Sequence, residues 1–192
     1  MKKKLIFISA ILSSLLLTSF IKTDLFPLDE RIPEPDAIVH EIMDETFAIL
    51  EKRYNIHPCG TGMNGKFEYL ELSFQMCDNI SQGKVREILF DCSQEFLKRI
   101  NANEKIQSYL KPYPFEQKNI GIVFFIRDED NQDVFDPKIC CAAIERGVFE
   151  YRTKTKENRF QYKETRKETF EQALTKIAQA QNIEPPKETK TR

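Results

Sequence analysis

Apolar and polar residues follow two different periods along the first half of the chain. Over residues 39–54 apolar side chains recur at helical spacing, which predicts a helix that opens at Pro35–Asp36 and ends near Asn55. Over residues 66–77 apolar and polar side chains alternate, which predicts a strand with one wet face. Residues 57–65 lie between these elements and are rich in glycine, so we expect a turn-rich loop there.

The second half of the chain begins with the clearest helical stripe and continues in short apolar runs. Residues 85–100 place their apolar side chains on one helical face, and Ser81 is a suitable N-cap for this helix. The remaining expected elements are strands at 120–127, 139–146 and 148–155, a short fourth piece at 159–163 and a last helix capped by Thr165.

This order of elements indicates the fold class. Strands that follow one another through short turns pair antiparallel and need no crossover. We therefore expect an α+β fold: a mostly antiparallel sheet of 4–5 strands with two or three helices packed on one face. The expected single domain covers residues 37–182.

The two ends of the chain have patterns of a different kind. Lysines at positions 2–4 precede an uncharged apolar run over residues 5–21, so residues 1–22 are typical of a signal peptide or membrane anchor. A cleaved signal, an uncleaved anchor in the inner membrane and a buried N-terminal helix remain open alternatives. Residues 23–36 are expected to be a Pro-rich spacer, and residues 183–192 a disordered tail. In the first two alternatives the domain lies outside the cytoplasm.

Composition and charge remove several classes of function. The net charge of −1 gives no sign of a nucleic-acid-binding protein, and the mean hydropathy of −0.49 excludes a multi-span membrane protein. No nucleotide-binding, hydrolase or metalloprotease motif is present, so we expect no cofactor. The acidic segment 128–133 does not fit a calcium-binding loop, and we expect no metal site.

One local string suggests nucleophilic catalysis. Cys59 lies two residues after His57, and His40 is the other histidine of the chain. A cysteine beside a basic histidine can act as the nucleophile of a thiol-dependent hydrolase or transferase. The alternative is a glycine-rich turn in which Cys59 only packs or forms a disulfide.

The five cysteines have no C-x-x-C spacing, which leaves zinc ribbons and thioredoxin-like chemistry unsupported. An exported protein can carry a disulfide. The candidate partners are Cys59 or Cys77 with Cys140 or Cys141, and a fully reduced protein is the open alternative. Cys92 lies on the apolar helical stripe and is expected to be a core residue.

A run of basic residues with interleaved aromatic side chains suggests a binding surface. An electropositive face there could bind anionic lipid, a polyanion or an acidic partner. The alternative is an ordinary wet strand face, because acidic residues lie among the basic ones. The candidate binding residues are Arg152, Lys154, Lys156 and Arg159.

Three short strings carry a resemblance to a known group of proteins. They are His57-Pro58-Cys59-Gly60-Thr61-Gly62, Asn101-Ala102-Asn103-Glu104 and Tyr113-Pro114-Phe115, behind a Lys-rich leader. In these strings the chain resembles a group of uncharacterised exported proteins of chlamydia-type intracellular bacteria, over about residues 40 to 180. The resemblance implies an envelope or secreted location and assigns no activity and no functional residue.

The sequence therefore predicts an exported or membrane-tethered, non-catalytic binding or structural protein of the bacterial cell envelope, periplasmic or secreted. Its expected partner is a protein or the envelope surface, and its N-terminal segment is expected to meet the membrane. The alternative function is a thiol-dependent enzyme that uses Cys59. A small-ligand binder that uses the wet face of the sheet is a third hypothesis.

Overall fold

A computed structural model describes residues 34–181. The signal or anchor predicted at 1–22, most of the predicted spacer and the tail at 183–192 lie outside the described residues. The elements in chain order are α2 (Glu34–Tyr54), β1 (His57–Met63), β2 (Leu70–Cys77), α3 (Gln82–Ala102), a 3-10 turn (Gln117–Asn119), β3 (Ile120–Arg127), β4 (Cys141–Glu145), β5 (Val148–Lys154), β6 (Tyr162–Thr169) and α4 (Phe170–Gln181).

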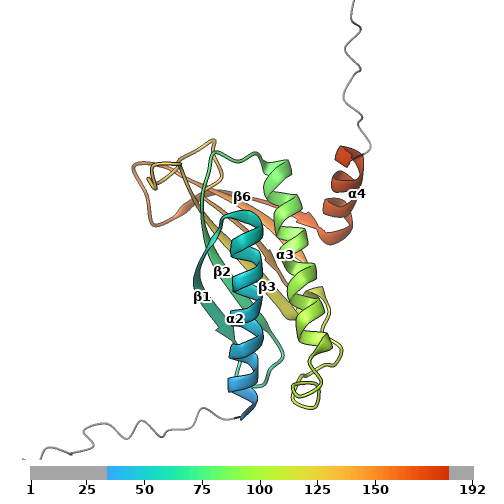
Figure 1. The fold of residues 1–192 in the computed structure, drawn as a ribbon. Helices are drawn as coiled ribbons and strands as arrows, with labels where there is room; N and C mark the ends of the chain where they lie inside the picture. Colours follow the sequence, from blue (N-terminus) through green and yellow to red (C-terminus); the bar gives the residue numbers. More distant parts are fainter. Residues whose placement is uncertain (1–33, 182–192) are drawn as a thin grey trace, which may run out of the picture. The chain divides into compact units, whose positions relative to one another are not determined.

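The strands form one six-stranded sheet in the order β1-β2-β3-β4-β5-β6 (Figure 1). All neighbours are antiparallel except β2 and β3, which run parallel because α3 connects them as a crossover helix. The α+β class and the mostly antiparallel sheet are confirmed. The sheet has six strands instead of four or five, because both of its edge strands had weak sequence signals.

The strand missing from the prediction is β1, which occupies the segment predicted to be a turn-rich loop, whereas β6 overlaps the short piece predicted at 159–163. Glycine and proline are depleted in strands, so the sequence favours a loop there. Pairing with β2 overrides this preference, and the ladder accommodates Pro58 through a register shift between Pro58 and Gly60. Cys59 is the residue left without a partner at this bulge.

The C-terminal boundaries also differ from the prediction. The charged segment Tyr162–Thr169 forms β6, so Thr165 lies within a strand and does not cap the last helix. Thr169 takes that role. Its Oγ1 accepts a hydrogen bond from the Gln172 amide at 3.2 Å, while the Gln172 side chain accepts one from the Thr169 amide at 2.9 Å. Helix α2 begins at Glu34, so the end of the predicted spacer is helical.

The inner face of the sheet meets the helices. Leu72 of β2 pairs with Ile122 of β3, which pairs with Ile144 of β4, and all three are fully buried. Helix α4 joins the same layer, because Phe170 packs against Phe149 of β5, with ring centroids 6.2 Å apart. The alternation seen in the sequence of β2 thus marks which side chains reach the core.

Glu168 ties the C-terminal helix to the rest of the inner layer. Its buried carboxylate accepts two hydrogen bonds from Arg86 of α3, at 2.7 and 2.8 Å, and one from Lys176 of α4 at 2.8 Å. Gln82 and the hydroxyl of Tyr151 complete its contacts. One acidic side chain of β6 therefore holds α3, α4 and β5 together.

No helix among residues 34–181 covers the outer face of the sheet (Figure 1). A small apolar cluster lies on this side and in the adjoining loop, and it includes Val123, Val134 and Ala143. Phe125 of β3 is 45% exposed on the same face. The domain is thus a two-layer structure with one open sheet surface.

Candidate functional site

The structure places Cys59 on an exposed edge strand without a catalytic base. Among residues 34–181, neither His57 nor His40 is hydrogen-bonded to its thiol. His57 instead lies 3.2 Å from the Glu51 carboxylate through its Nδ1, and His40 is half-buried on α2. Partial desolvation raises the pKa of the Cys59 thiol, which lowers its thiolate fraction at neutral pH. This geometry does not favour the thiol-enzyme hypothesis.

All five cysteines are free thiols, so none of the proposed disulfides is present. Cys141 is fully buried under Arg152, whose Nη1 lies 3.7 Å from its sulfur. Cys77 contacts the Asn131 side chain at 3.7 Å. Cys140 lies against the Arg152 carbonyl at 3.3 Å. These three candidate sulfurs are thus each engaged with non-sulfur neighbours, and burial raises the pKa of both vicinal thiols.

The predicted basic surface is largely neutralised within the domain. Arg152 binds the carboxylates of Glu145 and Glu150, at 2.9 and 2.5 Å. Burial acts to lower the pKa of Arg152, but the two carboxylates raise it by more than burial lowers it. The net pKa is therefore raised, and the guanidinium stays charged and paired. The face around Arg152 is therefore a balanced network and not a positive patch.

Two neighbouring basic side chains, Lys154 and Arg159, follow the same pattern. Asp133 pairs with both Lys154, at 3.2 Å, and Arg159, and these partners lower its pKa. Lys156 has its ammonium 5.8 Å from the centre of the Phe135 ring. A lysine or arginine that already has a carboxylate partner gains little from a second anion. The structure therefore favours the wet-strand alternative for this segment over an electropositive binding face.

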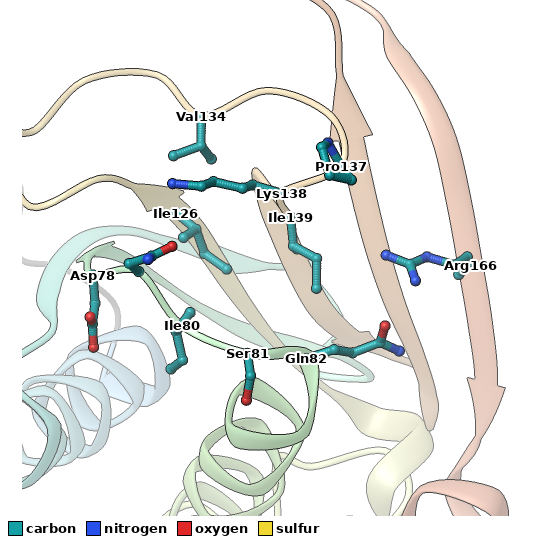
Figure 2. A pocket seen from close by; sticks show the side chains of 11 residues that line it. Asp78, Ile80, Ser81, Gln82, Ile126, Val134, Pro137, Lys138, Ile139 and Arg166 are labelled. Carbon is teal, nitrogen blue, oxygen red and sulfur yellow. The ribbon is translucent and has the colours of Figure 1, made fainter.

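A cavity of about 320 Å³ lies at the carboxyl ends of the parallel strands β2 and β3 (Figure 2). The connection from β2 to α3 forms one wall, the loop between β3 and β4 forms another, and Arg166 reaches toward it from β6. Its lining residues are Asp78, Asn79, Ile80, Ser81, Gln82, Ile126, Val134, Pro137, Lys138, Ile139 and Arg166.

The local sequence explains why a hollow forms at this position. Strand β2 ends at Cys77, and Ser81 begins α3 by accepting a hydrogen bond from the Lys84 amide at 3.3 Å. The chain between them must turn from the sheet into the helix layer, so it leaves the strand ends uncovered. Ligands of open sheets with parallel strands commonly bind at such carboxyl ends.

The lining of this cavity combines an apolar floor with charged groups at its rim. Ile126 and Ile139 are buried and supply the floor. The ammonium of Lys138 and the guanidinium of Arg166 give two positive charges against the one carboxylate of Asp78. Arg166 is only loosely paired, with Glu164 at 3.8 Å on the same face of the strand.

This arrangement is suited to binding a small ligand. No cysteine or histidine is among its lining residues. The described part of the chain holds no group of three or more candidate metal ligands. An apolar pocket with a few placed polar groups is the usual form of a small-ligand site.

The sequence did not single out this cavity, although it contained a partial signal. Arg166 follows the basic residues 152–159 in the sequence, but its position on the inner face depends on the register of β6, which the sequence did not predict. Lys138 and Asp78 lie in connecting segments without a periodic pattern. The strands before and after helix α3 pair in parallel, and a sequence signal for that pairing would have indicated a cavity at their carboxyl ends.

Comparison with protein-family models, with curated proteins and with solved structures finds no match. Among residues 34–181, no helix is both long enough and apolar enough to cross a membrane.

Proposed function

We propose that this protein is a non-catalytic binding domain of the bacterial cell envelope, exported or tethered through its N-terminal segment. The cavity at the ends of β2 and β3 is the observation that carries the binding function. The lysines at positions 2–4 and the apolar run at 5–21 support the location. The alternative that uses Cys59 as a nucleophile gains no support from the geometry around that residue.

The chemistry of the cavity limits the group that it can bind. Ile126 and Ile139 favour an apolar body, while Arg166 on one side of the cavity favours an anionic end, and Lys138 adds a positive charge on the other side. Arginine pairs with planar carboxylates through two parallel hydrogen bonds. The cavity therefore fits a carboxylate attached to a small apolar group, such as an acidic chain end or side chain of a partner protein.

Benzoate is a suitable first probe, because it combines a carboxylate with an apolar ring. We expect ligand-observed NMR to detect benzoate binding to the full chain, and benzyl alcohol, its uncharged match, to bind more weakly. Replacing Arg166 with alanine is expected to weaken benzoate binding by about tenfold, because one charge-assisted pair is lost.

Lys167→Ala is the matched control for this experiment. Lys167 follows Arg166 on β6 but lies on the other face of the sheet, where it pairs with Glu150 at 2.6 Å. Its replacement should leave benzoate binding unchanged. Equal binding of benzoate and benzyl alcohol, or equal effects of the two substitutions, would remove the cavity from the proposal.

The location is tested separately. Protease added to intact spheroplasts should degrade the domain of the full chain, while a variant with Lys2, Lys3 and Lys4 replaced by glutamate should be exported less efficiently, since these charges orient the leader. A domain that resists protease until the spheroplasts are lysed would contradict export without affecting the cavity.

A further inference from the structure

The two edges of the sheet are protected to different degrees. Strand β6 presents a row of charged side chains, which natural proteins use to prevent edge strands from pairing with other chains. Strand β1 carries no lysine, arginine or carboxylate, and its residues Gly60 and Gly62 leave the outer side of the strand flat. In Figure 1 β1 forms the free margin of the sheet beyond β2.

The hydrogen-bonding pattern shows which backbone groups of β1 are unused. The Asn64 amide donates to the Tyr69 carbonyl at 3.2 Å, so this pair is of the hydrogen-bonded kind. Pairs alternate along an antiparallel ladder, so Gly62 with Glu71 is hydrogen-bonded and Thr61 and Met63 are not bonded to β2. The amides and carbonyls of Thr61 and Met63 therefore point away from the sheet.

The bulge restricts where another strand can pair. Between Pro58 and Gly60 the register shifts, and Pro58 has no amide hydrogen to donate. The regular part of the edge is Gly60–Met63. Within it Met63 is 39% exposed, although its side chain lies on the same side of the sheet as buried Leu70. An added strand here would bury an apolar side chain that the isolated domain leaves in water.

We propose that β1 pairs antiparallel with β1 of a second copy of this chain, on a twofold axis at Gly62. This register places Thr61 of each copy opposite Met63 of the other copy. In each of these two pairs, the outward amide of either residue donates a hydrogen bond to the carbonyl of the residue that it faces. Gly62 then faces its own symmetry mate. The dimer has one continuous sheet that runs through both domains.

The segment is complementary to itself in this register. No charged side chain meets a like charge, because Gly60–Met63 carries none. The glycines bring no side chain to the axis, and each Met63 gains the Thr61 side chain of the other copy as a neighbour. The inference goes beyond the proposed ligand site, since β1 contributes no residue to the cavity.

Disulfide trapping tests the register directly. Facing residues of a non-hydrogen-bonded antiparallel pair have Cα atoms about 4.5 Å apart, which is within the range for a disulfide. The full chain with Cys59→Ser and Gly62→Cys should therefore give a covalent dimer under mild oxidation, lost on reduction. The new Cβ would lie 3.2 Å from the Glu71 Cβ, which is a tight contact. An unfolding curve of the variant must therefore accompany the gel electrophoresis that detects the dimer, to show that the variant is folded.

The control is Thr165→Cys in the same Cys59→Ser background, which puts an exposed thiol on the charged edge strand β6. It should remain monomeric under the same oxidation. Equal dimer yield from both variants, no dimer from Gly62→Cys, or crosslinking of the Gly62→Cys variant only to a different protein would each overturn the proposal.

A charge substitution gives a second measurement that does not depend on oxidation. In sedimentation equilibrium of the full chain in density-matched detergent, Thr61→Lys should raise the dimer dissociation constant by about tenfold or more, because two lysines then lie diagonally across the axis. Thr165→Lys, the same change on β6, should leave it unaffected. A monomeric wild-type chain at high concentration would contradict the proposal.

Discussion

Gly121 of β3 lies beneath two polar side chains, Tyr69 just before β2 and Glu71 within it. The Tyr69 hydroxyl donates to the Glu71 carboxylate at 3.0 Å, and the Arg146 guanidinium lies 5.2 Å from the centre of the Tyr69 ring. A Cβ at position 121 would overlap the Tyr69 hydroxyl and approach the Glu71 Cγ to 2.9 Å. The absence of a side chain at this residue is thus required by the contacts above it.

We expect Gly121→Ala to lower the free energy of unfolding by about 2 kcal/mol, because a methyl group is forced into an occupied space. Urea denaturation measures this change. Gly83→Ala on α3 is the control, since nothing lies within 4 Å of the Cβ that it would add. A loss of stability of the same size in both variants would show that the Tyr69 and Glu71 contacts are not the cause.

Cys59 allows a second prediction at this scale. Its exposure makes it accessible, but its raised pKa keeps most of the thiol protonated near neutral pH. We expect iodoacetamide to label Cys59 of the folded chain at pH 7.5 no faster than it labels glutathione, and to label buried Cys92 only after unfolding. Labelling of Cys59 well above the glutathione rate would revive the thiol-enzyme hypothesis.

At the scale of elements, Glu168 determines how the C-terminal strand and helix are held. Burial acts to raise its pKa, but the hydrogen bonds from Arg86 and Lys176 outweigh this effect and lower it from 4.5 to about 2. The ionised form is therefore favoured in the folded protein. Its contribution to stability is complete above about pH 5 and is lost as the pH falls toward 2.

We expect Glu168→Gln to cost about 3 kcal/mol in the free energy of unfolding at pH 7, because Arg86 stays buried without its counter-charge. The variant should also lose less stability than the wild type between pH 5 and pH 3. Urea unfolding at both pH values measures this. Glu164→Gln, at an exposed position of the same strand, should reproduce the wild-type pH dependence; if it matches Glu168→Gln instead, the contacts of Glu168 with Arg86 and Lys176 are not responsible.

The contrast between α3 and β1 explains which elements the sequence could predict. The apolar stripe and the Ser81 cap of α3 are local signals, so the helix could be placed from the sequence. Strand β1 has no such pattern, because its conformation depends on pairing with β2. The cavity was not predictable for the same reason: Lys138 and Arg166 line one cavity only through the pairing of β3 to β6.

For the whole molecule, the order of the strands predicts a gradient of local stability. β3 is paired on both sides, and its residue Phe124 is fully buried, whereas β1 and β6 are edges. Hydrogen exchange should therefore be slowest for amides of Ile122–Phe124 and faster for those of β6. Equal protection of β3 and β6 in hydrogen-exchange mass spectrometry would contradict this gradient.

The parallel pairing of β2 with β3 divides the described domain by sequence. Every other ladder joins strands that are adjacent in the chain and antiparallel, so residues before the α3–β3 connection and residues after it each contain their own hairpin pairings. A cut in that connection would leave two fragments with complete local ladders, which meet along the β2–β3 ladder and through the contacts of α3 with β3, β4 and α4. We expect such fragments, mixed in solution, to reassociate into the native sheet along these contacts.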